Sequence, residues 1–436
     1  KARNKRSWNT SHDTTSLAHT TADFKKHATT ARDPDHDRFS CHESGLLTRS
    51  TPRIGAGVLG FERAVPVCES RQLAAPSSRP PERGRTYGVG LLLQPRPGPW
   101  SCGALRDIVA MRIAINAWFL NRPGTGSGQY LHGLLQAMPE VMPGQRLLLA
   151  APHEQPDLHV TGLEIEHWSL NPARWRSNLG KVLFEQVAFP LICRRWAADL
   201  AHVPYWGSPL WTTVPTVVTV HDLIPRLLPA YRGGPFVRLY TQLVSASARQ
   251  AAVVLTDSQA AKHDIESHLN LSPDQVRAVY LAVGQQYQPQ PRPADEEIRA
   301  AYGLPHRYIL YLAGHDERKN VAGLVEAFSL VAQADDDVTL VIGGRLPAED
   351  RPPFFDPRPL VEALGLDADV HFIGWVDEEH KPALYRGAAC AVFPSRYEGF
   401  GLPVLEALAS GTPLVAANTA SLPELVGDAG FAVDPD

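Results

Sequence analysis

Short apolar runs that alternate with stretches of helical spacing dominate residues 111–436, and this alternation constrains the fold more than any other feature. Each run has about the length of one buried strand, ~4–8 residues, and turn-forming residues bound it. Strands that alternate with helices pair in parallel, because each helix carries the chain back to the same end of the sheet. The pattern therefore predicts an α/β fold built on parallel sheets.

The runs form two groups, separated by a hydrophilic, proline-marked linker at residues 289–306. We expect an N-terminal Rossmann-like domain over residues 111–288 and a C-terminal one over 307–436, facing each other across a cleft. Ligands of open parallel sheets bind beyond the carboxyl ends of the strands, so functional side chains should follow strands directly. Strands are expected at residues 112–119, 147–150, 163–168, 199–203, 216–220, 252–256, 276–281, 308–313, 339–342, 370–373, 391–393 and 413–416, and helices at 128–137, 178–196, 258–270, 321–332 and 379–386.

Residues 1–110 differ from the rest of the chain. Ser, Thr, Arg, His and Pro dominate, no hydrophobic period is sustained, and the chain begins with Lys1 rather than methionine. Ordered patterning begins at Met111, so our hypothesis is that residues 1–110 are upstream sequence read in frame. The alternative is a genuine disordered or targeting extension.

Charge and cysteine content narrow the function classes. Residues 1–110 carry 17 Lys+Arg and 10 Asp+Glu, whereas residues 111–436 carry 25 and 36, so the patterned part is acidic and lacks a nucleic-acid footprint. No run reaches the ~18 apolar residues of a membrane span. Five cysteines without metal-like spacing favour a reducing, cytoplasmic setting: Cys41, Cys68, Cys102, Cys193 and Cys390.

The sharpest motif follows the expected strand at residues 391–393. Gly399 and Gly401 allow close backbone approach, and a helix expected to start near Leu402 offers free amides to an anion such as a diphosphate. Glu398 and Glu406 border the same site and suit sugar hydroxyls better than phosphate. The alternative is an exposed glutamate before a turn and a helix-start glutamate that the dipole favours.

A second motif, at residues 314–320, follows the expected strand at 308–313 and opens a helix. Arg318 and Lys319 lie where the helix dipole disfavours cations, which indicates an anion between them and the helix. The alternative is a solvated turn.

Two further motifs follow strands of the first domain. Gly124, Gly126, Ser127 and Gly128 form a loop after the first strand, without the spacing of a dinucleotide fingerprint or Walker loop, and a plain tight turn explains it equally well. His221-Asp222 ends another strand. A lone histidine is more often structural, although its place at a strand end favours function.

The spacing of Glu398 and Glu406 matches the E-x7-E element of glycosyltransferase family 4, and residues 397–435 resemble that family nearly throughout. The resemblance implies a GT-B fold and a retaining hexosyltransferase that uses a nucleotide-diphosphate sugar. It implies that Glu406 binds the donor ribose and that Glu398 lies near the donor hexose. The backbone of Gly399, Phe400, Gly401 and Leu402 would cradle the diphosphate.

The resemblance extends to the other motifs. Lys319, and less strongly Arg318, would contact the donor diphosphate, although His315 stands where many members have arginine, which puts one phosphate contact in doubt. The loop over Gly126, Ser127 and Gly128 would contact phosphate and acceptor. His221 would bind the donor hexose, and Asp222 would orient the acceptor. The turn at residues 256–259 resembles a serine-bearing turn of the family, although a helix cap by Ser258 is the simpler explanation.

No metal or organic cofactor is implied. An Asp-x-Asp pattern at residues 33–37 follows no strand, and the aspartates at 335–337 lie before a strand, so we read both as decoys. Basic side chains and helix amides can stabilise the leaving diphosphate without a metal. The rival functions are a sugar-nucleotide epimerase of the same fold and a non-catalytic sugar-nucleotide-binding relative.

The donor and the acceptor are identified only by class. The His-Asp-Leu and Arg-Lys-Asn motifs resemble bacterial mannosyl- and other hexosyltransferases of surface polysaccharide assembly, so GDP-mannose is the first expectation and a UDP-hexose the second. The acceptor is expected to be a glycan or lipid-linked glycan, with possible peripheral membrane contact at the inner face of the cell membrane. The segments around Trp175-Arg176 and 194–196 fit a membrane-facing surface, or core aromatics beside solvated arginines. The family pattern continues past Asp436, so we expect truncation and weak or no activity.

Overall fold

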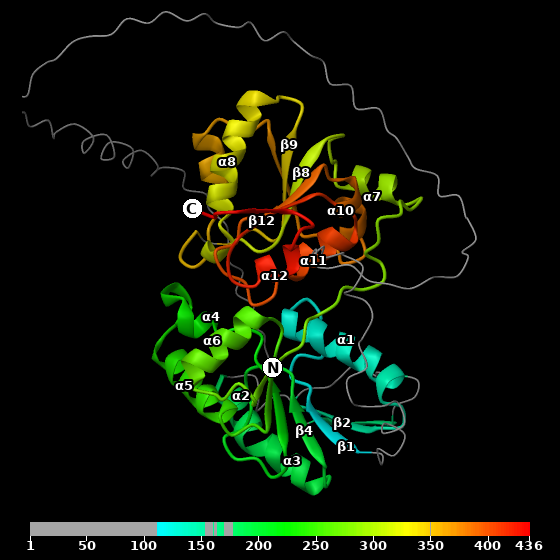
Figure 1. The fold of residues 1–436 in the computed structure, drawn as a ribbon, viewed down its shortest axis with the longest axis vertical. Helices are drawn as coiled ribbons and strands as arrows, with labels where there is room; N and C mark the ends of the chain where they lie inside the picture. The colour runs from blue at the N-terminus through cyan, green and yellow to red at the C-terminus, as the bar shows by residue number, and fades with distance from the viewer. Residues whose placement is uncertain (1–110, 153–159, 161–163, 170–177, 349) are drawn as a thin grey trace, which may run out of the picture. The chain divides into compact units, whose positions relative to one another are not determined.

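The computed structural model describes residues 111–152, 160, 164–169, 178–348 and 350–436. The expectations for residues 1–110, including the Asp-x-Asp pattern, lie outside these residues. Two parallel sheets organise the described chain, as the alternation of strands and helices predicted (Figure 1).

The first sheet has seven strands in the order β3-β2-β1-β4-β5-β6-β7, and every neighbouring pair is parallel. Its inner strand β1 has the sequence RIAIN and is buried on both faces, as crossover-connected parallel strands are. The strands are β1 (Arg112–Asn116), β2 (Arg146–Ala151), β3 (Glu164–Ser169), β4 (Leu200–Val203), β5 (Thr216–Thr219), β6 (Val253–Thr256) and β7 (Val276–Ala278).

Helices cover both faces of this sheet, with α1 on one side and α5 and α6 on the other (Figure 1). Alternation along β1 decides the faces: Ile113 and Ile115 pack with Leu131 of α1, whereas Ala114 joins the cluster that contains Phe189 of α3. The helices are α1 (Gly126–Val141), α2 (Asn178–Leu183), the π-helix η3 (Phe184–Ala188), α3 (Phe189–Arg195), α4 (Ile224–Leu227), the 3₁₀ turn η4 (Pro229–Tyr231), α5 (Pro235–Ala248) and α6 (Gln259–Leu269).

The second sheet has six strands in the order β10-β9-β8-β11-β12-β13, again all parallel. Two hydrophobic clusters lie on its two faces, one under α8 and α9 and one under α10, α11 and α12. The strands are β8 (Tyr308–Leu312), β9 (Thr339–Gly343), β10 (Val370–Gly374), β11 (Cys390–Phe393), β12 (Leu414–Ala417) and β13 (Phe431–Val433), and the helices are α7 (Asp295–Ala301), the 3₁₀ turn η5 (Glu317–Lys319), α8 (Val321–Ala334), α9 (Arg358–Ala363), α10 (Lys381–Gly387), α11 (Leu402–Ala409) and α12 (Leu422–Val426).

Several elements differ from the sequence-based expectation: α4, α5, α7, α9, α12 and β13 were not expected, and α7 lies inside the segment expected to be a linker. The single helix expected at residues 178–196 is interrupted by η3, one wide turn between α2 and α3. Helix α5 was not expected, because its buried face is built from small and polar residues. Its Ser245 and Ser247 satisfy their hydroxyls by donating to the carbonyls of Thr241 and Leu243, one turn back in the helix.

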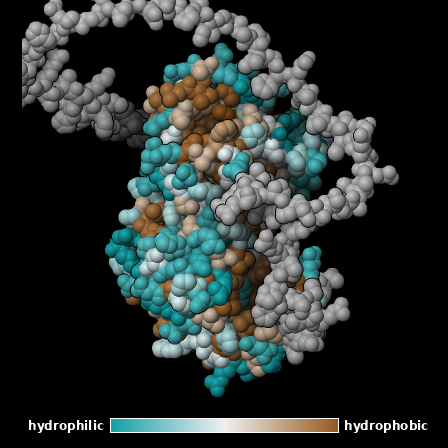
Figure 2. Space-filling view, viewed as in Figure 1, coloured by the Kyte–Doolittle hydropathy of each residue, from teal (hydrophilic) through white to brown (hydrophobic). Residues whose placement is uncertain are grey.

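The described surface mixes hydrophilic and hydrophobic residues, and in the face shown by Figure 2 one hydrophobic patch lies over α8. No helix among the described residues is long and apolar enough to cross a membrane.

Candidate functional site

Polar side chains gather at the carboxyl ends of β5 and β6. His221 and Asp222 follow β5, and Asp257 follows β6 directly. Since β5 and β6 are neighbouring parallel strands, both turns lie at the same edge of the sheet. Asp257 Oδ2 lies 2.7 Å from Nδ1 of His221, and the Asp257 side chain is only 5% exposed.

This histidine–aspartate pair leaves one ring nitrogen available. Nε2 of His221 is buried and has no hydrogen-bond partner among the described residues. Burial lowers the pKa of His221, but the hydrogen bond and charge of Asp257, together with the charge of Asp222 and the backbone oxygen of Pro204, outweigh burial, so the pKa lies above its ordinary value. Asp257 thus fixes the ring and keeps it readily protonated, with Nε2 as a donor to any ligand beside it.

In the second domain, Glu398 binds both cations that the sequence singled out. Its Oε1 lies 2.5 Å from Nζ of Lys319, and its Oε2 lies 2.7 Å from Nη1 of Arg318. The exposed fractions are 11% for Glu398, 10% for Lys319 and 18% for Arg318. Burial raises the pKa of Glu398, but the two cations outweigh it, so the pKa lies below its ordinary value. The group is therefore a buried, ionised triad.

This triad corrects two sequence-based interpretations. Arg318 and Lys319 do precede a helix, in the turn η5 before α8, but the anion that compensates them here is Glu398 itself. The readings of a solvated turn and of an exposed glutamate are both wrong, because Lys319 and Glu398 are largely buried. A diphosphate that reaches these cations must compete with the Glu398 carboxylate.

Gly399 brings the triad against the first domain. A Cβ on Gly399 would lie 2.6 Å from the backbone oxygen of His221 and 2.8 Å from Cβ of Asp222, so only glycine fits this approach. The carbonyl of Gly399 also accepts a 2.7 Å hydrogen bond from Oγ of Ser258. The structure thereby brings together four of the predicted site elements, His221, Asp222, Glu398 and Gly399.

Ser258 confirms the simpler reading of its turn. Its Oγ accepts a hydrogen bond of 3.0 Å from the amide of Ala261 and caps α6. Asp222, predicted to orient an acceptor, is held at the same edge by accepting from the amide of Ile224 at 3.0 Å. Burial raises the pKa of Asp222, and the charge of Arg318 partly offsets this.

Glu406 lies in a separate cluster. Tyr385 donates to its Oε2 at 3.2 Å, and the side chain is 7% exposed. Burial raises the pKa of Glu406, and the nearby charge of Lys381 partly opposes that shift. Glu398 and Glu406 therefore have different partners and different ionisation tendencies.

The glycine-rich loop starts α1 two residues earlier than expected, at Gly126. Thr125 caps the helix by accepting from the amide of Gly128 at 3.2 Å, and a Cβ on Gly128 would lie 2.1 Å from the carbonyl oxygen of Arg122. Gly126 meets no such obstacle, and Ser127 is half-buried. The loop is thus at least a tight helix start, and its contact with ligand stays a prediction.

The backbone at the start of α11 turns sharply, and its contact with a phosphate stays a prediction. Gly401 has φ of 110°, a conformation that favours glycine, and Leu402 begins the helix with amides that lack intrahelical partners. Phe400 is 5% exposed, with its ring centroid 6.3 Å from that of Tyr280. Phe400 therefore offers its backbone to this turn while its side chain packs inside.

His315 and the aspartates at 335–337 lie in different surroundings. His315 is 4% exposed, burial lowers its pKa, and neither ring nitrogen has a hydrogen-bond partner among the described residues. Asp335 pairs with Arg307 at 2.6 Å. Within the described ranges, no group of three or more His, Cys, Asp or Glu residues is placed to hold a metal ion.

Two family models match the chain. "Glycosyltransferase Family 4" matches residues 124–284, and "Glycosyl transferases group 1" matches residues 294–436. The chain belongs to glycosyltransferase family 4. O-antigen chain mannosyltransferase B of Escherichia coli is 33% identical over 222 residues, which are 50% of this chain and 57% of that relative. The chain therefore spans little more than half the length of this relative.

Solved structures confirm the GT-B fold of this family 4 chain. Sucrose-phosphate synthase from Thermosynechococcus elongatus aligns with a TM-score of 0.57 at 21% identity, over 75% of this chain and 86% of that one. Anabaena Alr3699/HepE in complex with UDP and glucose aligns with a TM-score of 0.54 at 19% identity, over 74% and 86%.

Sequence reasoning on this family 4 chain missed two site residues. Asp257 was quoted only as part of the serine-bearing turn, yet it follows β6 just as His221 follows β5, so the strand-end rule would have found it. Asp316 pairs with Arg318 at 3.0 Å and accepts from the hydroxyl of Tyr231 in the first domain. No local sequence pattern predicts that contact, because Tyr231 and Asp316 are 85 residues apart in the chain.

Proposed function

We propose that this protein is a retaining hexosyltransferase that moves mannose from GDP-mannose to a glycan or lipid-linked acceptor in polysaccharide biosynthesis. The single observation that carries the proposal is the Arg318–Lys319–Glu398 triad, held against His221 and Asp222 through Gly399. It combines cations for a diphosphate with hydroxyl-binding groups for a sugar.

The triad supports diphosphate chemistry. Lys319 and Arg318 supply two positive charges of low exposure, where an ionic interaction is screened less than in water. The amides at the start of α11 add a second anion-binding element. Together these groups would stabilise the negative charge that develops on the leaving diphosphate, so the proposal needs no metal ion or organic cofactor.

Side chains of both domains support sugar and acceptor binding. Nε2 of His221 is the buried, unpaired nitrogen of this site and would donate to a hydroxyl of the donor hexose. Glu406, with its neighbouring tyrosine, would bind the donor ribose. The proposed front-face route lets the leaving phosphate accept the acceptor proton, and Asp222 would orient that acceptor.

The choice of mannose draws on the similarity to the O-antigen chain mannosyltransferase. A UDP-hexose is the competing donor, because a structural neighbour was solved with UDP and glucose. A lipid-linked acceptor would place the protein in the cytoplasm at the inner face of the cell membrane.

The test is a binding and transfer experiment with a panel of sugar nucleotides. Isothermal titration with GDP-mannose, UDP-glucose, GDP and UDP identifies the nucleotide, and radiolabelled donors with bacterial lipid extracts as acceptors report transfer. We expect GDP-mannose to bind and radiolabel to enter an acceptor, with the α-configuration of the donor kept in the product by NMR.

Other outcomes would refute parts of the proposal. Preference for UDP-glucose would refute mannose, and inverted product would refute retention. Conversion of the donor to its epimer without transfer would favour the epimerase, and binding with neither transfer nor hydrolysis would favour a non-catalytic relative.

A further inference from the structure

Four large apolar side chains stand in solvent along α2, η3 and α3. Leu179, Leu183, Val187 and Leu191 are 60%, 45%, 50% and 58% exposed, and we name them the apolar stripe. They occur at every fourth position. A monomeric surface seldom gathers large apolar residues in one row, so this row calls for a partner.

The π-helix keeps the stripe on one face. In a regular α-helix each step of four residues turns by about 40°, so such a row drifts around the axis. The wider turn of η3 (Phe184–Ala188) rotates the later residues back. The interruption that the sequence did not predict therefore aligns Val187 and Leu191 with Leu179 and Leu183.

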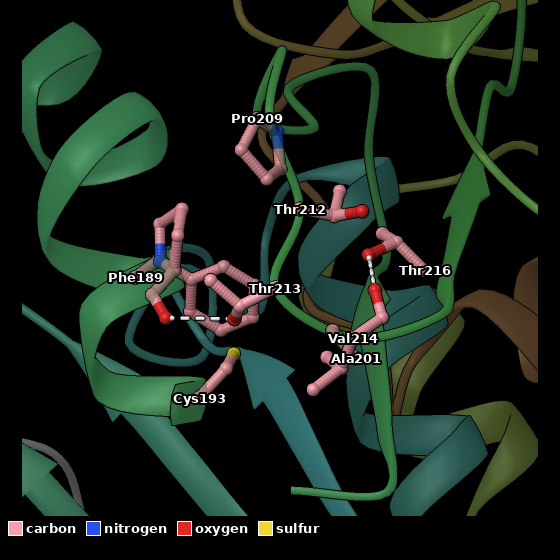
Figure 3. A pocket seen from close by; sticks show the side chains of 9 residues that line it. Phe189, Cys193, Ala201, Pro209, Thr212, Thr213, Val214 and Thr216 are labelled. Carbon is pink, nitrogen blue, oxygen red and sulfur yellow. Dashed lines mark hydrogen bonds between the residues drawn. The ribbon is translucent and has the colours of Figure 1, made fainter. Parts of the chain in front are cut away.

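An exposed tryptophan lies beside the stripe. Trp211 is 80% exposed, and Gln186, next to Val187, holds its loop through hydrogen bonds of 2.9 Å to the carbonyl of Ser208 and 2.8 Å from the amide of Leu210. Figure 3 shows the other side of the same loop against α3, where Thr213 donates to the carbonyl of Pro190 at 3.2 Å.

The start of α5 extends the same surface. Tyr240 donates to Glu185 of η3, with 2.9 Å between its hydroxyl oxygen and Oε2, and this contact fixes α5 against the helix of the stripe. Phe236 lies one turn before Tyr240 on the same side of α5 and is 45% exposed.

The segments that carry the apolar stripe, Trp211 and α5 are basic, whereas residues 111–436 as a whole are acidic. Residues 178–196, 206–215 and 223–250 contain seven Lys and Arg but one acidic residue, Glu185, which is 0% exposed. Residues 111–436 as a whole carry 25 Lys+Arg and 36 Asp+Glu. Arg194 and Arg195, next to the end of the stripe, are exposed. The surface is therefore apolar with a basic border.

We propose that the apolar stripe, with Trp211 and the start of α5, docks onto an anionic lipid bilayer. Leucine and valine side chains would enter the acyl boundary, Trp211 would lie at the headgroup level, and Arg194 and Arg195 would pair with lipid phosphates. The docking goes beyond the proposed transfer reaction, because lipid binding requires neither donor nor acceptor. Of the sequence-based membrane candidates it keeps Arg194 and Arg195, whereas Trp196 donates to Glu166 at 3.0 Å, and Trp175 and Arg176 lie outside the described residues.

The test is co-sedimentation of the full chain with vesicles of 70% phosphatidylcholine and 30% phosphatidylglycerol, and with vesicles of phosphatidylcholine alone. We compare the wild type with the double variant Leu183→Ser/Leu191→Ser. Leu330→Ser is the matched control, because Leu330 of α8 is 67% exposed and lies in the second domain. Residues 1–110, which carry a net positive charge, are the same in all three proteins, so a difference in vesicle binding between them reports on the substituted residues alone.

We expect the double variant to lose at least about tenfold in partition onto the anionic vesicles, with the control unchanged. Arg194→Ser/Arg195→Ser should lose about fivefold per arginine on anionic vesicles only. Melting temperatures and nucleotide titration, measured on each variant, separate misfolding or a failed donor site from failed docking. Equal partition of the wild type and the double variant, or no vesicle binding by the wild type, overturns the proposal. A reversible dimer that the double variant abolishes would instead assign the stripe to a second copy of the chain.

Discussion

Replacing Glu398 with glutamine should lower stability and raise nucleotide affinity at the same time. The substitution keeps the shape of the side chain but removes the charge between Lys319 and Arg318, which are 10% and 18% exposed. Loss of one partner from a buried ion pair costs about 3–5 kcal/mol, and the residual exposure of this triad favours the lower end, about 3 kcal/mol.

The effect on affinity has the opposite sign. Without the Glu398 carboxylate, a diphosphate meets Lys319 freed of its carboxylate partner, while Arg318 keeps only Asp316, 3.0 Å away. Removing one unit charge about 8 Å away at an effective dielectric of about 20 changes the energy by about 2 kcal/mol, and screening by solvent reduces this to about 1.4 kcal/mol, or about tenfold. GDP or UDP should gain this factor, whereas the sugar nucleotide should gain less, because its hexose hydroxyl exchanges a charged carboxylate acceptor for a weaker amide oxygen.

The stabilisation of the folded state by ionised Glu398 also has a defined pH dependence. The pKa of Glu398 is lowered in the folded state relative to its ordinary value of 4.5. Its stabilisation is therefore fully present above pH 4.5 and is lost as the pH falls through the folded pKa. The difference in stability between wild type and variant should thus be constant near pH 7 and shrink in acid.

Urea denaturation at several pH values and isothermal titration with nucleotide measure both effects. Glu362→Gln, an exposed glutamate on α9, makes the same charge change away from the triad and serves as the control. A variant that binds nucleotide more weakly than wild type, or that is as stable as wild type at pH 7, would refute the competition between Glu398 and the diphosphate.

Three further outcomes follow from single contacts. Lys319→Met should weaken nucleotide binding by about 10- to 100-fold in titration, the range for a hydrogen bond to a charged group, and an unchanged affinity would place the diphosphate elsewhere. Asp257→Asn should lower the pKa of His221 in an NMR titration. In the wild type the pair stabilises the fold fully below pH 6.5 and this stabilisation is lost as the pH rises through the folded pKa, so the variant should lack it. An unchanged pKa of His221 would contradict this. Ser258→Ala should lower the free energy of unfolding in urea by about 1–2 kcal/mol, since it removes a helix cap and the hydrogen bond to Gly399. Ser258→Thr keeps the hydroxyl and should retain most of this stability.

The sequence by itself determined the fold class and named the candidate site residues. Buried parallel strands read as apolar runs, and turns at their carboxyl ends are where ligands of such sheets bind, so His221, Lys319 and Glu398 were candidates from local pattern, and the family resemblance favoured them over the structural alternatives. Gly399 and Gly401 were recognisable because backbone approach and positive φ demand glycine. These features depend on neighbours within a few residues.

Only the tertiary structure decided which of these residues meet. Glu398 and Lys319 are 79 residues apart, and His221 and Asp257 are 36 apart, so no periodicity links them. The dipole argument found an anion near Lys319 but could not identify it as Glu398, because a carboxylate and a ligand satisfy the same charge. The π-turn that aligns Leu183 with Val187 has no local signature either, since its extra residue is accommodated by packing. Local pattern determines whether a segment forms a strand, a helix or a turn, whereas ion pairs and packing between distant segments determine which side chains form the site.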